Sequence, residues 1–325
     1  MNSRFNYLLE KIDKASFATK PFKHIEIFDF LDAADFEEII QTNEINIKSA
    51  GSDEELFVAL FEAGYKMVPF PGAITDHNEY MRKRKSAKKV ESHTACESAG
   101  VVLRLVNPSS PVLEELKLFI ESDLFNNALA KKFDINYDSV SSDSGIQKYL
   151  DEYEISPHPD MRKKALTFMV NINNSQKSEE KNHHTHYMTF KDEKAYVSDF
   201  WKYNVDVERC WVPWDWCDTA KQQKKNNSIV IFAPSNDTLH AIKADYDHYS
   251  SQRTQLYGNL WYQDVLDQPF KKPKMTIEWE GLDIVNFRNS PKSQRSLITR
   301  ISNKLKRNFL GSNASKIEKS RSNNY

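Results

Sequence analysis

The chain has 325 residues, of which 39% are hydrophobic and 12% aromatic, and this apolar content excludes a disordered protein. Its 45 basic and 46 acidic residues nearly cancel, so bulk charge predicts no nucleic-acid partner. The three cysteines form no metal-binding pattern, and the sequence shows neither a signal-peptide core nor the roughly 18 apolar residues of a membrane span. We therefore expect a cytoplasmic protein.

The first 140 residues combine helical and strand patterns, and we expect them to support the core. Ser52 and Glu55 match a capping box, Asp32 is a second candidate cap, and one strand-like alternation slips by a place after Ile27. The segments with helical periodicity are 1–20, 32–43, 52–65 and 110–133, and those with strand composition are 23–31 and 98–107.

From about residue 145 short β-rich runs follow one another, separated by turn residues. Helices gathered first and strands afterwards favour one mainly β core, a sandwich or barrel, with a helical buttress. We divide the chain into a support region at 1–140, a core at 141–270 with an insertion at 174–227, and a C-terminal extension at 271–325. The extension contains a basic amphipathic pattern, "SLITRISNKLKRNFL", that fits either a solvated appendix or a contact for an acidic partner.

The stretch "EISPHPDMRKKALTFMVNIN" contains the first candidate site. His158 and Asp160 are two residues apart, and residues i and i+2 of a strand point to the same side. A neutral imidazole and a carboxylate suit Fe(II), provided that a second histidine completes the set. The interleaved prolines support a competing interpretation, in which this is a turn whose charged tips face water.

Two residues farther along the chain favour the metal interpretation. His240 stands in the strand-like segment after "NNSIVIFAP", and Arg253 opens the next one, "RTQLYGNLWY". Three ligands would leave positions on iron for a 2-oxo acid and dioxygen. The far carboxylate of that co-substrate needs a cation, and a guanidinium offers it a bidentate partner.

Together these segments resemble the Fe(II)- and 2-oxoglutarate-dependent oxygenases, in particular the prolyl-hydroxylase-like branch. "GIQKYLDEYEISPHPDMRKKALTFMVNIN" is similar to that branch's strand, metal loop and following strand, and "IFAPSNDTLHAI" and "QRTQLYGNLWY" are similar to its distal-histidine and co-substrate segments. The likeness covers residues 21–265, with the specific motifs in 145–262. It implies a double-stranded β-helix, the jelly-roll fold of cupins.

The resemblance implies roles for particular residues. His158, Asp160 and His240 would bind Fe(II), and Arg253 would bind the outer carboxylate of 2-oxoglutarate. Tyr149 stands where the family often has a phenol against the co-substrate. Gln255 occupies a second co-substrate position that often carries a hydroxyl in the family, so this contact departs from the pattern. Dioxygen is the other co-substrate implied, with ascorbate supporting activity.

The candidate substrate-binding residues have less support in the sequence than the candidate metal ligands, and for each of them a purely structural role is the alternative. They are Gln147 on the face of Tyr149, His186 in a polar loop, Trp211 and Trp214 in an aromatic segment that suits core or lid packing, Lys164 in a charged run, and Arg104 on an apolar strand where a structural ion pair is the alternative.

The function expected from this pattern is oxidation of an unactivated C–H bond of a small biosynthetic molecule, with release of succinate and CO2. Because Asp160 is present, halogenation is not expected; halogenating relatives leave that coordination position open. Hydroxylation of a protein or peptide, as in prolyl hydroxylases, is the alternative within the class. A cupin-like binding protein without catalysis is the alternative of another class.

Overall fold

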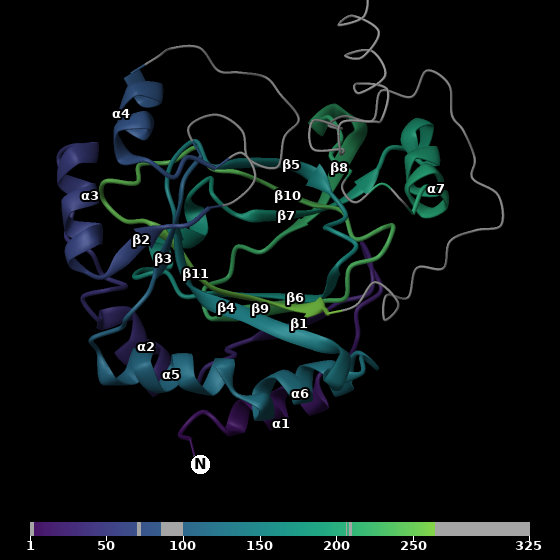
Figure 1. Cartoon of the computed structure of the whole chain (residues 1–325), viewed down its shortest axis with the longest axis horizontal. Helices are drawn as coiled ribbons and strands as arrows, with labels where there is room; N and C mark the ends of the chain where they lie inside the picture. The colour runs from purple at the N-terminus through teal and green to yellow at the C-terminus, as the bar shows by residue number, and fades with distance from the viewer. Residues whose placement is uncertain (1–2, 70–72, 86–99, 206, 208–209, 264–325) are drawn as a thin grey trace, which may run out of the picture. The chain divides into compact units, whose positions relative to one another are not determined.

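Eleven strands form two antiparallel sheets in the part of the chain that the computed structural model describes, namely residues 3–69, 73–85, 100–205, 207 and 210–263 (Figure 1). The strands are β1 (Ile25–Phe28), β2 (Tyr65–Met67), β3 (Val102–Leu105), β4 (Val140–Tyr149), β5 (Glu154–His158), β6 (Lys164–Asn171), β7 (Thr185–Phe190), β8 (Cys217–Gln222), β9 (Ser228–Phe232), β10 (His240–Lys243) and β11 (Arg253–Tyr262). The larger sheet has the order β1-β9-β6-β11-β4-β3-β2 and the smaller one β5-β10-β7-β8.

The strands from β4 to β11 wind between the two sheets as a double-stranded β-helix. Strands β4, β6, β9 and β11 lie together in the larger sheet, and β5, β7, β8 and β10 make up the smaller one. This confirms the predicted jelly-roll core. The segment 174–227 is not an insertion as a whole, because it supplies β7 and β8; β7 pairs directly with β10 in the middle of the smaller sheet.

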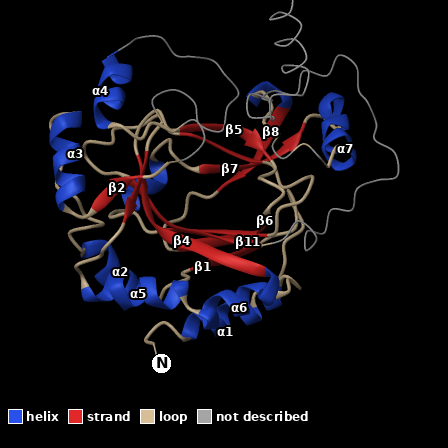
Figure 2. Ribbon diagram, in the orientation of Figure 1, coloured by secondary structure: helices blue, strands red, loops and turns tan. Residues whose placement is uncertain are grey.

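Helices cover the outer face of the larger sheet (Figure 2). These are α1 (Tyr7–Lys14), α2 (Ala33–Gln41), α5 (Pro111–Glu121) and α6 (Asp123–Lys132). Their apolar residues share one buried cluster with the outward-facing side chains of the sheet, for example Ile146 of β4 and Leu256 of β11. Helix α3 (Asp53–Glu62) packs beside β2, α4 (His77–Lys85) follows it, and α7 (Tyr196–Tyr203) packs near β8.

Each predicted N-terminal segment contains an element of the predicted type, and β2 and α4 are additional elements. Two predictions differ in detail. The predicted helix 110–133 is two helices, because Ser122 adopts an extended conformation, ends α5 and caps α6 by accepting a hydrogen bond from the Phe125 N–H (3.3 Å). Ser52 likewise accepts from the Glu55 N–H (3.2 Å), as predicted. Asp32 precedes α2 but makes no side-chain cap; its carboxylate pairs with Lys11 at 2.8 Å instead.

Beyond these elements, the C-terminal extension at 271–325, with its basic amphipathic pattern, lies outside the described residues. Within the described ranges, no helix combines the length and apolar character needed to cross a membrane. The described residues belong to one compact unit, so the described parts of the support region and of the β core share a unit.

Side chains of β4 alternate strictly between the cavity and the helices. Tyr149 and Gln147 face the space between the sheets, and Lys148 points the other way into the apolar layer. There its amine donates to the Ile45 carbonyl and the Thr254 hydroxyl, both at 2.8 Å. Burial lowers the Lys148 pKa from 10.5 to about 7, so above that pH a neutral amine with two N–H groups serves two acceptors.

This buried lysine predicts a pH-dependent stability. The pKa of Lys148 is lower in the folded than in the unfolded protein. The contribution of its neutral amine to the free energy of unfolding is therefore fully present above the unfolded pKa and is lost as pH falls toward about 7. As pH rises from 7.5 to 9.5, the free energy of unfolding of the wild type, measured in urea, should increase relative to that of Lys148→Met by up to about 1.4 kcal/mol per pH unit. Lys66→Met, at an exposed position of β2, is the control. A constant difference between wild type and Lys148→Met would contradict the prediction.

A candidate iron and co-substrate site between the sheets

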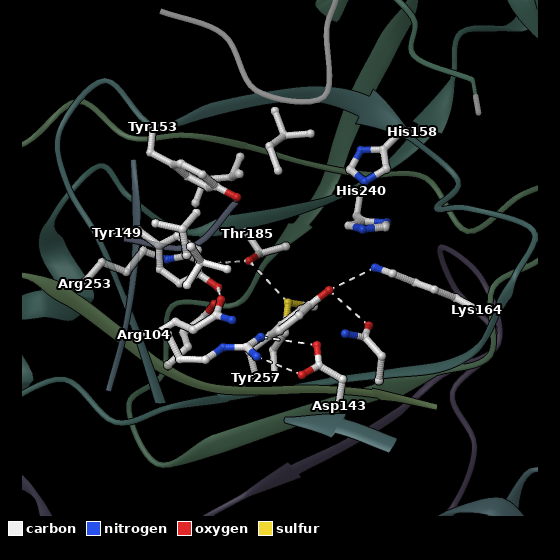
Figure 3. A pocket seen from close by; sticks show the side chains of 18 of the residues that line it. Arg104, Asp143, Tyr149, Tyr153, His158, Lys164, Thr185, His240, Arg253 and Tyr257 are labelled. Atoms are coloured by element: carbon white, nitrogen blue, oxygen red, sulfur yellow. Dashed lines mark hydrogen bonds and ion pairs between the residues drawn. The ribbon is translucent and has the colours of Figure 1, made fainter. Parts of the chain in front are cut away.

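A cavity of about 360 Å³ lies between the two sheets and is lined by side chains from both. Its apolar lining residues include Val68, Val102, Tyr149, Tyr153, Ile155, Met161, Met169, Ile242 and Trp261, and its polar ones include Arg104, Asp143, Gln147, His158, Lys164, Thr185, His240, Arg253, Gln255, Tyr257 and Asn259. Figure 3 shows the two imidazoles at one side of this space and Arg253 with Tyr149 at the other.

Three residues at one side of this space could hold a metal ion: His158 and His240, which line the cavity, and Asp160, which lies beside them. His158, Asp160 and His240 each place one ligand atom within 4.8 Å of the others. Strand β10 pairs with β5 so that His240 lies directly opposite His158, and the two ring centroids are 4.3 Å apart. The sheet register therefore brings together side chains that are distant in the sequence.

Backbone carbonyls orient both imidazoles. The Nδ1–H of His158 donates to the Ser156 carbonyl, and that of His240 to the Thr238 carbonyl, each at 2.9 Å. Both Nε2 atoms are then left with a lone pair, and they lie 3.8 and 3.7 Å from the Asp160 carboxylate. Burial lowers the pKa of His158 to about 3 and also lowers that of His240, so both rings are neutral near pH 7 and can act as donors to a metal.

Asp160 is held by its loop and by two side chains. Its backbone has a φ of 78°, and the preceding Pro159 carbonyl accepts a hydrogen bond from the Thr238 hydroxyl at 2.9 Å. Lys164 Nζ contacts one carboxylate oxygen at 2.7 Å, and the Thr167 hydroxyl contacts the other at 3.0 Å. Burial alone would raise the Asp160 pKa, but the Lys164 charge and both imidazoles bring it far below its usual range, so the group is a carboxylate.

Arg253 is a buried cation that faces the same cavity. Its Nη2 donates to the Thr185 hydroxyl at 2.8 Å, and its guanidinium lies over the Tyr149 ring, 4.6 Å from the centroid. The residue is 3% exposed, and no carboxylate of the described residues lies within ion-pair distance of it. Burial lowers the Arg253 pKa, which reflects the cost of keeping this charge without a counter-ion.

The other residues predicted from the sequence divide into two groups. Gln147, Gln255, Lys164 and Arg104 line the cavity, but His186, Trp211 and Trp214 do not. The inward-facing residues of β7 are Thr185 and Tyr187, so alternation turns His186 outward, where its ring contacts the Thr219 hydroxyl at 2.9 Å and packs edge-on against Trp214. Trp211 is buried in an apolar cluster, 6.5 Å from the His158 ring.

Sequence reasoning missed several cavity residues for which a signal existed. Asp143 lies on the face of β4 that carries Gln147 and Tyr149, and Tyr257, Asn259 and Trp261 continue the face of β11 that starts with Arg253 and Gln255. Extending the two-residue period along both strands would have found them. Thr185 carried no such signal, because it reaches Arg253 from the opposite sheet.

No protein-family model and no curated protein sequence matches the chain. Similar solved structures include a Pseudomonas putida prolyl-4-hydroxylase (8% identity, TM-score 0.40, 80% of this chain and 99% of that one) and a Trichoplax adhaerens prolyl hydroxylase in complex with a hypoxia-inducible-factor peptide (9%, 0.37, 83% and 93%). A third is the epimerase SnoN in complex with Fe3+, alpha-ketoglutarate and nogalamycin RO (10%, 0.33, 79% and 83%). The fold assignment rests on the strand order described above.

The geometry predicts saturable binding of one divalent transition metal. In a Co(II) titration followed by absorbance, His158→Ala and Asp160→Ala should each weaken binding by at least about 100-fold, because each variant removes one of three donors. His186→Ala removes an imidazole that points away from the cavity, and it should bind Co(II) like the wild type. Equal binding by all the variants would show that the three residues are not the ligands.

Proposed function

We propose that the protein is an Fe(II)- and 2-oxoglutarate-dependent oxygenase. The observation that carries this proposal is that both histidines of a two-histidine, one-carboxylate cluster line the same cavity as a buried guanidinium that has no carboxylate partner among the described residues. The first feature suits a metal ion with open coordination positions, and the second suits a dianionic co-substrate.

The donor set fits ferrous iron. His158 and His240 offer neutral nitrogen, Asp160 offers charged oxygen, and the set contains no thiolate that would favour a structural zinc or an iron–sulfur cluster. One Asp160 oxygen would coordinate the metal while the other keeps its hydrogen bond to Lys164 or Thr167. Hydrogen bonds of this kind hold a ligand in place before the metal arrives.

The spacing between Arg253 and the imidazoles fits a short dicarboxylate. Thr185, which accepts from Arg253, pairs with Ile242, and Ile242 lies two residues along β10 from His240, a span of about 7 Å. 2-Oxoglutarate has four C–C bonds of about 1.5 Å each, so an extended molecule reaches from the metal donors to the guanidinium. Its outer carboxylate would be the missing counter-ion of Arg253, with the Thr185 hydroxyl beside it.

The residues around Arg253 have supporting roles in this proposal. Tyr149 holds the guanidinium against its ring face and carries its own hydroxyl 2.6 Å from the Gln147 side chain. Gln255, whose amide donates to Asn171 at 2.8 Å, lines the cavity where the family often has a hydroxyl residue. Thr185 provides a hydroxyl from the smaller sheet instead.

Bound iron and 2-oxoglutarate would supply the oxidising chemistry, in which dioxygen is activated, succinate and CO2 are released, and an unactivated C–H bond is oxidised. The protein would hold the metal and the dicarboxylate, keep bulk water out of the cavity between the sheets, and place the target carbon near the two imidazoles. A small molecule is the substrate class we propose, because the cavity lies between the sheets and is only large enough for the co-substrate and a compact second ligand.

Succinate release tests the proposed activity. Wild-type protein with Fe(II), 2-oxoglutarate and ascorbate in air should form succinate slowly without a substrate and faster with one. In Asp160→Ala the rate of succinate formation should fall by at least about 100-fold, because its metal site is incomplete. Small metabolites and proline-containing peptides, assayed separately, distinguish the proposed substrate class from a peptide hydroxylase. A non-catalytic cupin-like protein would release no succinate under any of these conditions.

Arg253→Gln gives a more specific test of the co-substrate site. Loss of the guanidinium charge should raise the KM for 2-oxoglutarate by about 10- to 100-fold, which corresponds to about 1.4 to 3 kcal/mol of binding free energy. The affinity for Co(II) should not change. Lys243→Gln removes a cation from the exposed surface of β10 and serves as the matched control. An unchanged KM in Arg253→Gln would assign the dicarboxylate to another cation.

A further inference from the structure

A second pair of opposite charges lines the cavity, apart from the groups assigned to metal and co-substrate. Arg104 of β3 and Asp143 of β4 form two parallel hydrogen bonds, Nη1 to Oδ1 at 2.8 Å and Nη2 to Oδ2 at 3.2 Å. Their side chains are 25% and 45% exposed, so both remain open to a ligand. In Figure 3 the pair lies at the opposite edge of the cavity from the imidazoles, with Tyr257 drawn between them.

The structure around this pair holds the arginine in place. Arg104 lies across Gly145, where a Cβ atom would stand only 3.1 Å from Arg104 Cδ and 3.3 Å from Nε, so a larger residue would displace it. The Gln147 amide is satisfied on both sides when its oxygen accepts from Arg104 (2.8 and 3.1 Å) and its nitrogen faces the Tyr149 hydroxyl. The guanidinium is therefore fixed flat against β4 with its position set before a ligand binds.

The remaining charges of the cavity already have partners in the proposed reaction. Lys164 is tied to Asp160 at 2.7 Å and to the Tyr257 hydroxyl at 2.9 Å, and Arg253 faces the co-substrate. Among the described residues that line the cavity, Arg104 and Asp143 are thus the charged side chains left for the substrate.

A pair of this kind selects for a ligand that carries both charges. An anion alone, bound to Arg104, would leave the Asp143 carboxylate without its counter-ion, and a cation bound to Asp143 would do the same to Arg104. A zwitterion satisfies both groups at once and leaves the net charge of the cavity unchanged. The two charges of an α-amino acid are separated by only two bonds and match the adjacent guanidinium and carboxylate.

We propose that the substrate is a free α-amino acid, whose carboxylate pairs with Arg104 and whose ammonium group pairs with Asp143. The side chain of the amino acid then extends past Tyr257 toward His158 and His240, where the carbon to be oxidised lies. This inference rests on the proposed oxygenase function. It narrows the substrate class to compounds with an unblocked amino acid head group and excludes residues within a peptide.

Binding to the purified full-length chain tests the head-group preference directly. Each of the twenty protein amino acids is titrated by calorimetry, and the tightest ligand is compared with its N-acetyl and methyl ester derivatives. At least one free amino acid should bind, and each blocked derivative should bind at least tenfold more weakly, because each leaves one member of the charge pair unsatisfied. Binding by none of the twenty, or equal binding of blocked and free forms, would overturn the proposal.

Two variants test the residues. Asp143→Asn and Arg104→Gln should each lower the affinity for the free amino acid at least tenfold, and Asp143→Asn should reduce the preference for the free amine over its N-acetyl form. Asp218→Asn, at an exposed position of β8, is the matched control. Circular dichroism of each variant identifies any that fails to fold. If folded variants keep wild-type affinity and preference, Arg104 and Asp143 do not bind the head group.

The same samples separate this proposal from the oxygenase function. If the wild type binds a free amino acid but neither binds Co(II) nor forms succinate, the oxygenase function fails while the head-group site stands. If it forms succinate and a peptide stimulates turnover where free amino acids do not, the oxygenase function stands and the amino acid proposal is overturned.

Discussion

The pairing of β10 with β5 is the constraint on which the site depends. It sets His240 opposite His158 on adjacent strands, and the hydrogen bond from Thr238 to the Pro159 carbonyl joins the same two segments beyond the end of the pairing. The carbonyls of Ser156 in β5 and of Thr238, just before β10, then orient both imidazoles toward the Asp160 carboxylate. The sheet places the two imidazoles, and Lys164 and Thr167 hold the Asp160 carboxylate, so the three donor atoms are in position before a metal binds.

Around this cluster the cavity keeps its charges in three separate arrangements. Asp160 is balanced by Lys164 and Arg104 by Asp143, whereas Arg253 contacts the Tyr149 ring and the Thr185 hydroxyl and has no carboxylate partner in the described part of the chain. A buried cation without a counter-ion lowers stability, and such a group is retained where an anion binds. This difference in pairing is the basis on which we propose a different ligand for each of the three groups.

The two-residue period of β-strands explains which cavity residues could be predicted from the sequence. It places Thr254 on the face of β11 opposite Arg253 and Gln255, where its hydroxyl contacts the buried Lys148. The same rule places Gln147 and Gln255 in the cavity. His186, a candidate from a polar segment, does not line the cavity, because the register of β7 on β10 decides which residues of β7 face inward, and the polar and aromatic side chains of this six-residue strand do not reveal that register.

The sequence by itself determined the types and spacing of the candidate ligands, the amphipathic helices of the support region and the β-rich character of the core, because these are local patterns of polarity and chemistry. Only the tertiary structure decided that 110–133 breaks at Ser122, that 174–227 supplies two strands of the smaller sheet, and that Arg104 meets Asp143 across Gly145. Those outcomes depend on hydrogen-bond register and packing between segments distant in the chain, and no local pattern encodes such contacts.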